Sequence, residues 1–218
     1  MNKLNFASLR LLFATLCLAL AWSASAQAES QQGKQYTLVS PAQPTETGKN
    51  IEVLEFFSYA CPHCNDLEPL LNPWVKKLPQ DVTFRRLPAV FSENWMIYAR
   101  IFYAFEAMGV LEKQHPAIFN AVHVQHINLG NEKTLLEWVG KQGLDSKKFA
   151  EVYGSFSVMN KAQRAKQLTR AYGITGVPSI AVEGAYLTSA SQTGSHEQMF
   201  PVLDELIKKV RQQRGGKN

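Results

Sequence analysis

The chain has 218 residues, 45% of them hydrophobic and 19% charged, which is enough for one large domain or for a small domain that carries an insertion. Its formal net charge is only +5, and the Lys and Arg residues form no extended block. A mildly basic chain without such a block gives no case for nucleic acid as a partner.

The first 28 residues have the features of a secretory signal peptide. A basic start precedes an apolar run at residues 11–21 that is too short to cross a bilayer as a helix. Small residues follow at once, so we expect cleavage after Ala26 or Ala28 rather than an uncleaved membrane anchor. Cleavage removes Cys17 and leaves two cysteines. Two thiols cannot form the disulfide framework of a small secreted domain, so we expect them to react and an ordinary core to stabilise the fold.

The strongest predicted strand covers residues 51–57, after a short strand at residues 36–39 and a turn-rich segment. Apolar residues occupy both of its faces, as in a strand that is covered on two sides. Glu55 departs from this pattern, because it shares a face with Ile51 and Val53. We therefore expect its carboxylate to lie inside the protein, close to the residues that follow the strand.

The motif Cys61-Pro62-His63-Cys64 follows this strand directly and stands where a helix should begin. In the first turn of a helix the two sulfur atoms lie on one face, close enough to form a disulfide. Free amide groups and the positive end of the helix dipole favour a thiolate at the first cysteine. We therefore interpret Cys61 as the nucleophile and Cys64 as the resolving thiol. Pro62 supports the first helical turn without removing a needed amide donor.

The helix that contains the motif should run from residue 61 to about residue 78, kinked or broken by its internal prolines, Pro69 and Pro73. A second strand is predicted at residues 82–90, with Arg86 on its inward face. An inward arginine next to the inward acid of the preceding strand allows an ion pair, which is how a protein tolerates two buried charges.

Residues 92–158 change to helical spacing and predict a mainly helical block. The first helix carries an apolar stripe from Trp95 to Tyr103. The expected helices of the block lie at residues 92–109, at residues 116–124, after a cap at Asn131, and from Asp145 onward.

A long helix at residues 159–172 leads out of this block. A hairpin follows around the turn Glu183-Gly184, with its strands at residues 179–182 and 185–188. Ser195 then caps a final helix that should end at about residue 210.

The order of elements is strand, strand, helix, strand, helical block, helix, strand, strand, helix, and this order is thioredoxin-like. We therefore predict an α/β thioredoxin fold with an inserted α-helical domain. Its parts in chain order are a thioredoxin-like part at residues 35–91, the inserted helical domain at 92–158, a second thioredoxin-like part at 159–212 and a flexible tail at 213–218.

Three segments of the sequence match one protein family. They are Val53-Leu54-Glu55-Phe56-Phe57-Ser58, the motif Cys61-Pro62-His63-Cys64, and Gly176-Val177-Pro178-Ser179. With these segments behind a signal peptide, the chain resembles the DsbA family of periplasmic thiol:disulfide oxidases. The resemblance implies a location in the periplasm, a monomer, and catalysis by the two cysteines without a cofactor or a metal.

The resemblance also implies roles for residues around the motif. Pro178 would follow a cis peptide bond and face the disulfide, with the Val177 backbone exposed to an extended substrate; an ordinary trans proline is the alternative. His63 would stabilise the Cys61 thiolate and thereby the reduced protein, which makes the disulfide oxidising. That effect is a known property of the family, and the sequence adds only His63 at the matching position. An exposed polar spacer is the alternative for His63.

Two acids and one arginine complete the site that the resemblance implies. Glu55 matches a buried acid that eases proton movement at the inner thiol, and Glu68 matches a second acid. The pKa of Glu55 rises if burial dominates and stays low if Arg86 pairs with it, and the sequence leaves both outcomes open. A purely structural ion pair is the alternative role for Glu55, and a solvated side chain is the alternative for Glu68.

The reaction of the family is the donation of the Cys61–Cys64 disulfide to reduced, unfolded exported proteins through a mixed disulfide. A DsbB-like membrane protein would then reoxidise the dithiol. A disulfide isomerase or reductase of the same fold, and a peptide-binding chaperone with incidental thiols, are the alternatives. A zinc site is disfavoured, because the motif cannot supply a tetrahedron from one helical turn, and His123 and His126 are expected at the surface.

Overall fold

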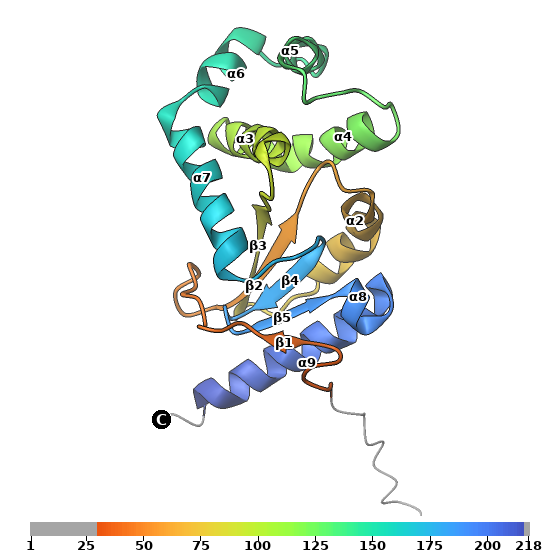
Figure 1. The fold of residues 1–218 in the computed structure, drawn as a ribbon, viewed down its shortest axis with the longest axis vertical. Coiled ribbons are helices and arrows are strands. Elements are labelled where there is room, and N and C mark those ends of the chain that lie inside the picture. Colours follow the sequence, from red (N-terminus) through yellow and green to blue (C-terminus); the bar gives the residue numbers. More distant parts are fainter. Residues whose placement is uncertain (1–29, 216–218) are drawn as a thin grey trace, which may run out of the picture.

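The computed structural model describes residues 30–215. The predicted signal peptide with Cys17, and the last three residues of the predicted tail, lie outside this range. The strands are β1 (Thr37–Leu38), β2 (Ile51–Phe57), β3 (Val82–Pro88), β4 (Ser179–Val182) and β5 (Tyr186–Ser189). They form one five-stranded sheet at the centre of the described range, in the spatial order β1-β5-β4-β2-β3 (Figure 1).

The strand β2 has the bounds that the sequence predicts and lies between β3 and β4. Its parallel register with β3 places Glu55 directly opposite Arg86. The strand β3 ends two residues before the predicted position. The amide of Val90 instead donates to the Thr169 hydroxyl at 3.1 Å, which turns the chain away from the sheet.

Both faces of β2 are covered, as predicted, and all of its residues are buried. On one face, Ile51 and Val53 pack against α2 (Pro62–Val75) and α9 (His196–Gly215). On the other face, Leu54 and Phe56 pack against α7 (Phe156–Ala171) and the residues that follow it. The sheet is therefore the middle of three layers, which holds the end of β2 rigidly in place.

The helix α2 is continuous through both of its prolines, so of the predicted kink or break the break does not occur. Pro69 and Pro73 lie one turn apart on the exposed side of the helix. Each proline removes one amide donor from the helix, and on this exposed side water can satisfy the carbonyl group that loses its partner. The helix ends at Val75, three residues before the predicted end.

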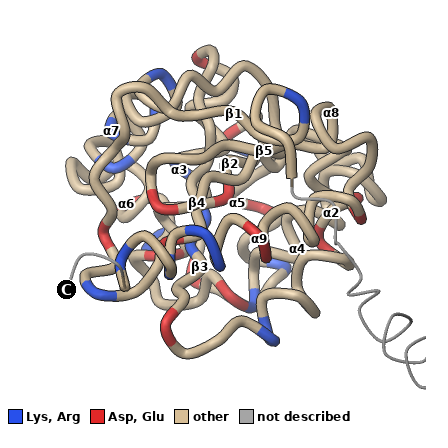
Figure 2. Tube along the Cα trace, turned by 90° about the horizontal axis from the view of Figure 1, so that it is seen from below, with Lys and Arg blue, Asp and Glu red and all other residues tan. Residues whose placement is uncertain are grey.

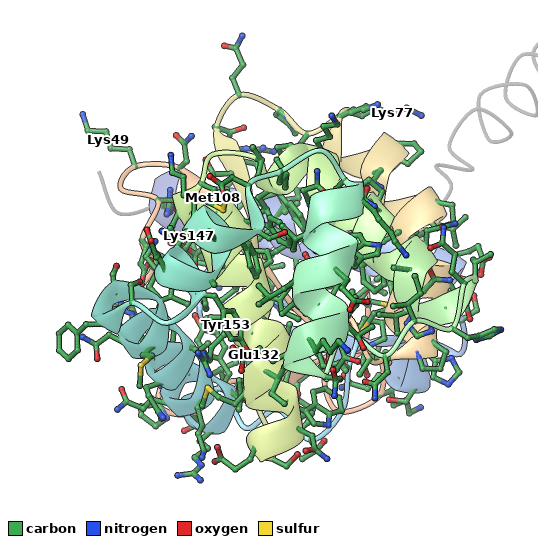
Figure 3. The ribbon with its side chains drawn as sticks, turned by 90° about the horizontal axis from the view of Figure 1, so that it is seen from above. Lys49, Lys77, Met108, Glu132, Lys147 and Tyr153 are labelled. Carbon is green, nitrogen blue, oxygen red and sulfur yellow. The ribbon has the colours of Figure 1, made fainter. Side chains whose placement is uncertain are left out.

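A layer of helices covers the end of the sheet at which β2 and β3 end (Figure 1). It contains α3 (Glu93–Ala107), α4 (Leu111–His123), α5 (Glu132–Lys141) and α6 (Ser146–Tyr153). Figure 3 looks down on this layer, in which the Tyr153 ring of α6 packs on the guanidinium of Arg100 in α3 at 3.9 Å. The helices share a core of buried aliphatic and aromatic residues with the end of β2.

Two of the predicted helix caps are present. The Asn131 side chain accepts from the Thr134 amide at 3.0 Å, and the Asp145 side chain accepts from the Lys147 amide at 2.9 Å. Two other helices begin earlier than predicted. The helix α4 begins at Leu111 with its proline inside, and α7 begins at Phe156 after a Ser155 cap.

The predicted hairpin joins β4 to β5 through Glu183 and Gly184, both of which have positive φ angles. A short helix that the sequence did not predict, α8 (Ala190–Thr193), follows β5. The helix α9 begins after Ser195, as predicted, but extends to Gly215 instead of residue 210. It therefore includes the first three residues of the segment that was predicted to be a flexible tail.

Charged residues of both signs are interspersed over the view from below the sheet (Figure 2). Ion pairs connect several of them, including Arg211 of α9 with Asp81 at 2.7 Å. Within residues 30–215, no helix is both long enough and apolar enough to cross a membrane.

We predict that Gly184→Ala lowers the free energy of unfolding by about 3 kcal/mol, because it combines a left-handed backbone with a steric clash. A Cβ atom at this glycine, whose φ is +62°, would lie 2.0 Å from the Gln43 carbonyl oxygen. Equilibrium unfolding in urea measures the loss.

Gly143→Ala is the matched control, since Gly143 has a φ of +78° and no atom within 4 Å of the added methyl group. It should cost only the backbone term, about 1 kcal/mol. Equal losses in the two variants would contradict the close approach of the hairpin to Gln43.

Candidate active site

The motif lies at the junction between the end of β2 and the start of α2, as predicted. Cys61 is the N-cap residue of α2, with an extended backbone, and Pro62 is the first helical residue. The amides of Cys64 and Asn65 donate to the Cys61 carbonyl at 3.2 and 3.3 Å. Both cysteines are reduced thiols; Cys61 is half-buried and Cys64 is completely buried. A substrate can therefore reach the sulfur of Cys61 and not that of Cys64.

The two thiols differ strongly in acidity. A hydrogen bond from the Cys64 thiol outweighs the opposing effect of burial and lowers the pKa of Cys61 to about 6. Backbone amides and the charge of His63 act in the same direction. Burial, and then the neighbouring Cys61, raise the pKa of Cys64 far above its ordinary value. At neutral pH the pair therefore consists of an accessible thiolate and a buried thiol.

The Val177-Pro178 peptide bond is cis and lies against the motif, as the sequence analysis expected. The Cys61 sulfur is 3.4 Å from the carbonyl oxygen of Val177. Cys61 and Val177 are both partly buried, and both pack against the apolar core of the helical layer. The site therefore lies at the contact between the sheet and that layer.

His63 is exposed in the first turn of α2, next to Cys61. Its ring lies edge-on to the ring of His196, at the start of α9, with 6.4 Å between the ring centroids. The charge of His63 is one of the influences that lower the pKa of Cys61. The structure thus places this histidine where the sequence expected it.

Glu55 is fully buried, and its Oε2 atom lies 3.2 Å from Nε of Arg86. This contact is not aligned as a hydrogen bond, and within residues 30–215 neither carboxyl oxygen of Glu55 has a hydrogen-bond partner. Burial raises the pKa of Glu55 to about 8, because it outweighs the attraction of Arg86 and is reinforced by the charge of Glu68. Of the two outcomes that the sequence left open, burial dominates, although the pair with Arg86 does form.

Glu68 is not solvated, so the alternative that the sequence offered for it is wrong. Its carboxylate is buried and lies 3.2 Å from Arg86 Nη2, 2.9 Å from Asn72 Nδ2 and 3.1 Å from His115 Nε2. Burial acts to raise the pKa of Glu68, but the hydrogen bonds from His115 and Asn72 and the charge of Arg86 outweigh it and lower the pKa. Glu68 is therefore a carboxylate, whereas Glu55 holds a proton at neutral pH.

The sequence analysis missed Tyr59 and His115 and misplaced His123. The Tyr59 hydroxyl lies 2.7 Å from His115 Nδ1, and His123 is half-buried, with its Nε2 atom 2.8 Å from the Tyr59 carbonyl oxygen. The apolar spacing of Leu111, His115 and Ile118 along α4 was a signal that His115 is buried. That signal was overlooked because the helix was expected to begin only at residue 116. Among residues 30–215 no group of three or more His, Cys, Asp or Glu is arranged to hold a metal ion.

Comparison with known proteins places these features in a family. Residues 83–200 match the family of the DSBA-like thioredoxin domain. Over 202 residues the chain is 38% identical to the thiol:disulfide interchange protein DsbA of Pseudomonas aeruginosa, covering 92% of this chain and 96% of that protein. It is 37% identical to the protein of the same name from Burkholderia cepacia, covering 93% and 98% of the two chains.

Solved structures show the same similarity in three dimensions. The crystal structure of Pseudomonas aeruginosa DsbA superposes with a TM-score of 0.82 at 36% identity, covering 87% of this chain and 98% of that one. The oxidoreductase NmDsbA1 from N. meningitidis superposes with a TM-score of 0.77 at 31% identity, covering 87% and 98%. The predicted thioredoxin fold with an inserted helical domain is confirmed.

We predict that Cys64→Ala raises the pKa of Cys61 from about 6 toward the ordinary value of a cysteine, because the hydrogen bond from Cys64 is the largest influence that lowers it. The ultraviolet absorbance of the thiolate, followed against pH in the reduced protein, gives the midpoint. Cys61→Ser should remove this titration altogether. A midpoint near 6 in Cys64→Ala would refute the role of the Cys64 hydrogen bond.

We predict that Glu55→Gln stabilises the reduced protein at alkaline pH. The pKa of Glu55 is raised from 4.5 to about 8, so the stability that its protonated form contributes is full below 4.5 and is lost as the pH rises to about 8. Glutamine does not ionise and avoids this loss. Urea unfolding should show that the variant gains on the order of 5 kcal/mol relative to wild type between pH 4.5 and 8.5.

Glu68→Gln is the matched control, because the pKa of Glu68 is lowered. Its carboxylate contributes stability above the ordinary pKa of a glutamate, and that stability is lost as the pH falls. This variant should therefore be destabilised at neutral pH. The same sign of effect in both variants would contradict the assignment of the proton to Glu55.

Proposed function

Because this chain belongs to the DsbA family of thiol:disulfide interchange proteins, we propose that it works as an oxidase. In this direction it donates the Cys61–Cys64 disulfide to reduced, newly exported proteins. The observation that carries the proposal is the unequal acidity of the two thiols, with the pKa of the accessible Cys61 lowered to about 6.

The reaction is a pair of thiol–disulfide exchanges. A substrate thiolate attacks the Cys61 sulfur, a mixed disulfide forms, and Cys64 leaves and takes up a proton. A second substrate thiolate then attacks the substrate sulfur of the mixed disulfide, and Cys61 leaves as a thiolate. The substrate has lost two electrons and gained a disulfide, and the enzyme has gained two electrons as a dithiol.

The low pKa of Cys61 sets the direction of this exchange. A thiol of low pKa is a good leaving group, so the second step is fast. Stabilising the thiolate also stabilises the reduced protein relative to its disulfide, which makes the disulfide a strong oxidant, as is known for this family. We assign to His63 the supporting role of a positive charge beside the Cys61 thiolate, and to Pro62 that of shaping the first turn.

Glu55 is proposed as the proton donor to Cys64. Two buried acids of β2 differ in a way that supports this role. Glu52 receives a hydrogen bond from Arg85 at 2.8 Å and another from the Glu46 amide at 2.9 Å. A buried carboxylate with a purely structural role is expected to have such donors. Glu55 has no aligned donor within the described residues, and its pKa of about 8 lets it hold a proton at neutral pH and deliver it to a departing thiolate. Burial raises that pKa, the charge of Arg86 opposes the rise and the charge of Glu68 adds to it.

Val177 is proposed to guide the substrate. Its carbonyl oxygen lies 3.4 Å from the Cys61 sulfur, beside the cis Pro178. An extended substrate segment that pairs with the Val177 backbone would bring its own cysteine against the accessible sulfur. Such pairing through the main chain accepts many sequences, which suits an enzyme for unfolded proteins.

The proposed compartment is the periplasm, reached by means of the signal peptide predicted at residues 1–28. A dithiol produced there needs an electron acceptor, and we assign this task to a DsbB-like membrane protein. The enzyme is proposed to act as a monomer without a cofactor or a metal.

We expect the oxidised protein to oxidise a reduced, unfolded substrate stoichiometrically, with Cys61→Ser inactive because no mixed disulfide can form. Equilibration against glutathione redox buffers distinguishes the directions of transfer. An oxidase remains mostly reduced in buffers that leave a reductase oxidised, because its dithiol form is the stabilised one.

The control is Cys64→Ala, which has no disulfide to donate and should not oxidise reduced substrate, but whose Cys61 thiolate should still attack oxidised glutathione, forming a mixed disulfide and releasing one reduced glutathione. An equilibrium in the range of a reductase would overturn the oxidase proposal, and so would undiminished substrate oxidation by Cys61→Ser.

A further inference from the structure

A chain of buried polar contacts joins the helical layer to the acid beneath the motif. The Tyr59 hydroxyl lies 2.7 Å from His115 Nδ1, and His115 Nε2 lies 3.1 Å from Glu68 Oε1. Arg86 Nη2 lies 3.2 Å from both oxygens of Glu68, and Arg86 Nε lies 3.2 Å from Glu55. Four separate parts of the chain are thus connected by consecutive polar contacts. The helical layer takes part through His115 of α4.

The direction of the hydrogen bonds along this line follows from the chemistry of its members. Burial raises the pKa of Tyr59, so its hydroxyl keeps its proton and donates to Nδ1 of His115. Burial also lowers the pKa of His115, so the ring is neutral and carries its one hydrogen on Nε2. That N–H points at the Glu68 carboxylate. Tyr59 thereby selects the tautomer in which His115 is a donor to Glu68.

The surroundings hold the His115 ring in this orientation. The rings of Phe57, Phe102 and Phe119 pack edge-on around it, with centroids 5.2, 6.5 and 5.2 Å away. The charged groups that face it are Glu68 from α2, Arg86 from β3 and Glu112 from its own helix. Arg86, Glu112 and His115 also line a cavity of about 350 Å³ beside β3.

Arg86 is one cation that contacts two acids of the site. It contacts Glu55 and Glu68, and its Nη2 group also donates to Asn72 at 3.0 Å. The negative charge of Glu68 opposes ionisation of Glu55, while the charge of Arg86 favours it. Any group that holds Glu68 ionised and in contact with Arg86 therefore helps to keep the proton on Glu55.

We propose that His115 is a positioning residue for the exchange reaction: its Nε2–H, fixed by Tyr59, holds the Glu68 carboxylate against Arg86 and so keeps Glu55 protonated. The helical layer then takes part in the proton chemistry at the buried thiol and does not only cover the site. This inference rests on the proposed function of Glu55 as the proton donor to Cys64.

The test compares His115→Phe with His115→Gln. Phenylalanine fits the aromatic surroundings but has no N–H, whereas glutamine retains a donor at the position of Nε2. The readout is the titration of the Glu55 carboxyl, followed by ¹³C NMR of the reduced full-length protein, together with the pH profile of substrate oxidation. We expect His115→Phe to lower the midpoint of Glu55 by about one pH unit, and His115→Gln to restore it.

His126→Asn is the control for loss of a histidine, because His126 is exposed and asparagine tolerates its positive φ of 55°. It should leave the titration unchanged. Circular dichroism and thermal unfolding show whether each variant is folded. If His115→Phe does not fold, Tyr59→Phe removes only the hydroxyl that selects the tautomer and should shift the midpoint in the same direction.

An unchanged Glu55 midpoint in folded His115→Phe, or an equal shift in His115→Gln, overturns the proposal. The failure of the proposed function looks different. If wild type does not oxidise substrate, the oxidase assignment falls, while the carboxyl titration still reports whether His115 controls Glu55. If wild type oxidises substrate and the Glu55 midpoint is the same in wild type and in His115→Phe, only the proposed role of His115 is refuted.

Discussion

The site depends on one electrostatic constraint: a single, partly buried cation lies between two buried acids. The guanidinium of Arg86 lies between Glu55 and Glu68 and cannot neutralise both. Glu68 receives additional donors from Asn72 and His115, so it keeps the negative charge, and Glu55 keeps the proton. Burial makes this division stable, since an uncompensated second carboxylate in the interior would be far more costly than a neutral acid.

The fold provides this arrangement through three elements that meet at one edge of the sheet. Parallel register sets Glu55 of β2 opposite Arg86 of β3, and α2 carries both Glu68 and the thiols directly above them. The helix α4 of the helical layer packs against the same region. Its His115 contacts the Tyr59 hydroxyl, and its His123 contacts the Tyr59 backbone carbonyl. The residues just before the motif are thus fixed by both the sheet and the inserted helices.

Local patterns were sufficient to predict much of this architecture. The alternation along β2 predicted its bounds and the burial of Glu55, because a covered strand leaves no solvated face. The position of the motif at a helix start predicted which thiol is reactive. The contacts of Glu68 and His115 were not predictable in this way, since they join α2 to α4 across 47 residues of sequence. The continuity of α2 was missed for a related reason, because only the fold shows that its prolines face water.

The complete burial of Cys64 also has a kinetic consequence for the mixed disulfide. A stalled intermediate can dissociate without oxidising its substrate when the second enzyme sulfur attacks the first and expels the client. Cys64 is a poor attacker, because burial raises its pKa and keeps it a thiol. In the proposed oxidase reaction, this slow attack gives the second cysteine of the client time to reach the mixed disulfide, which favours oxidation over release.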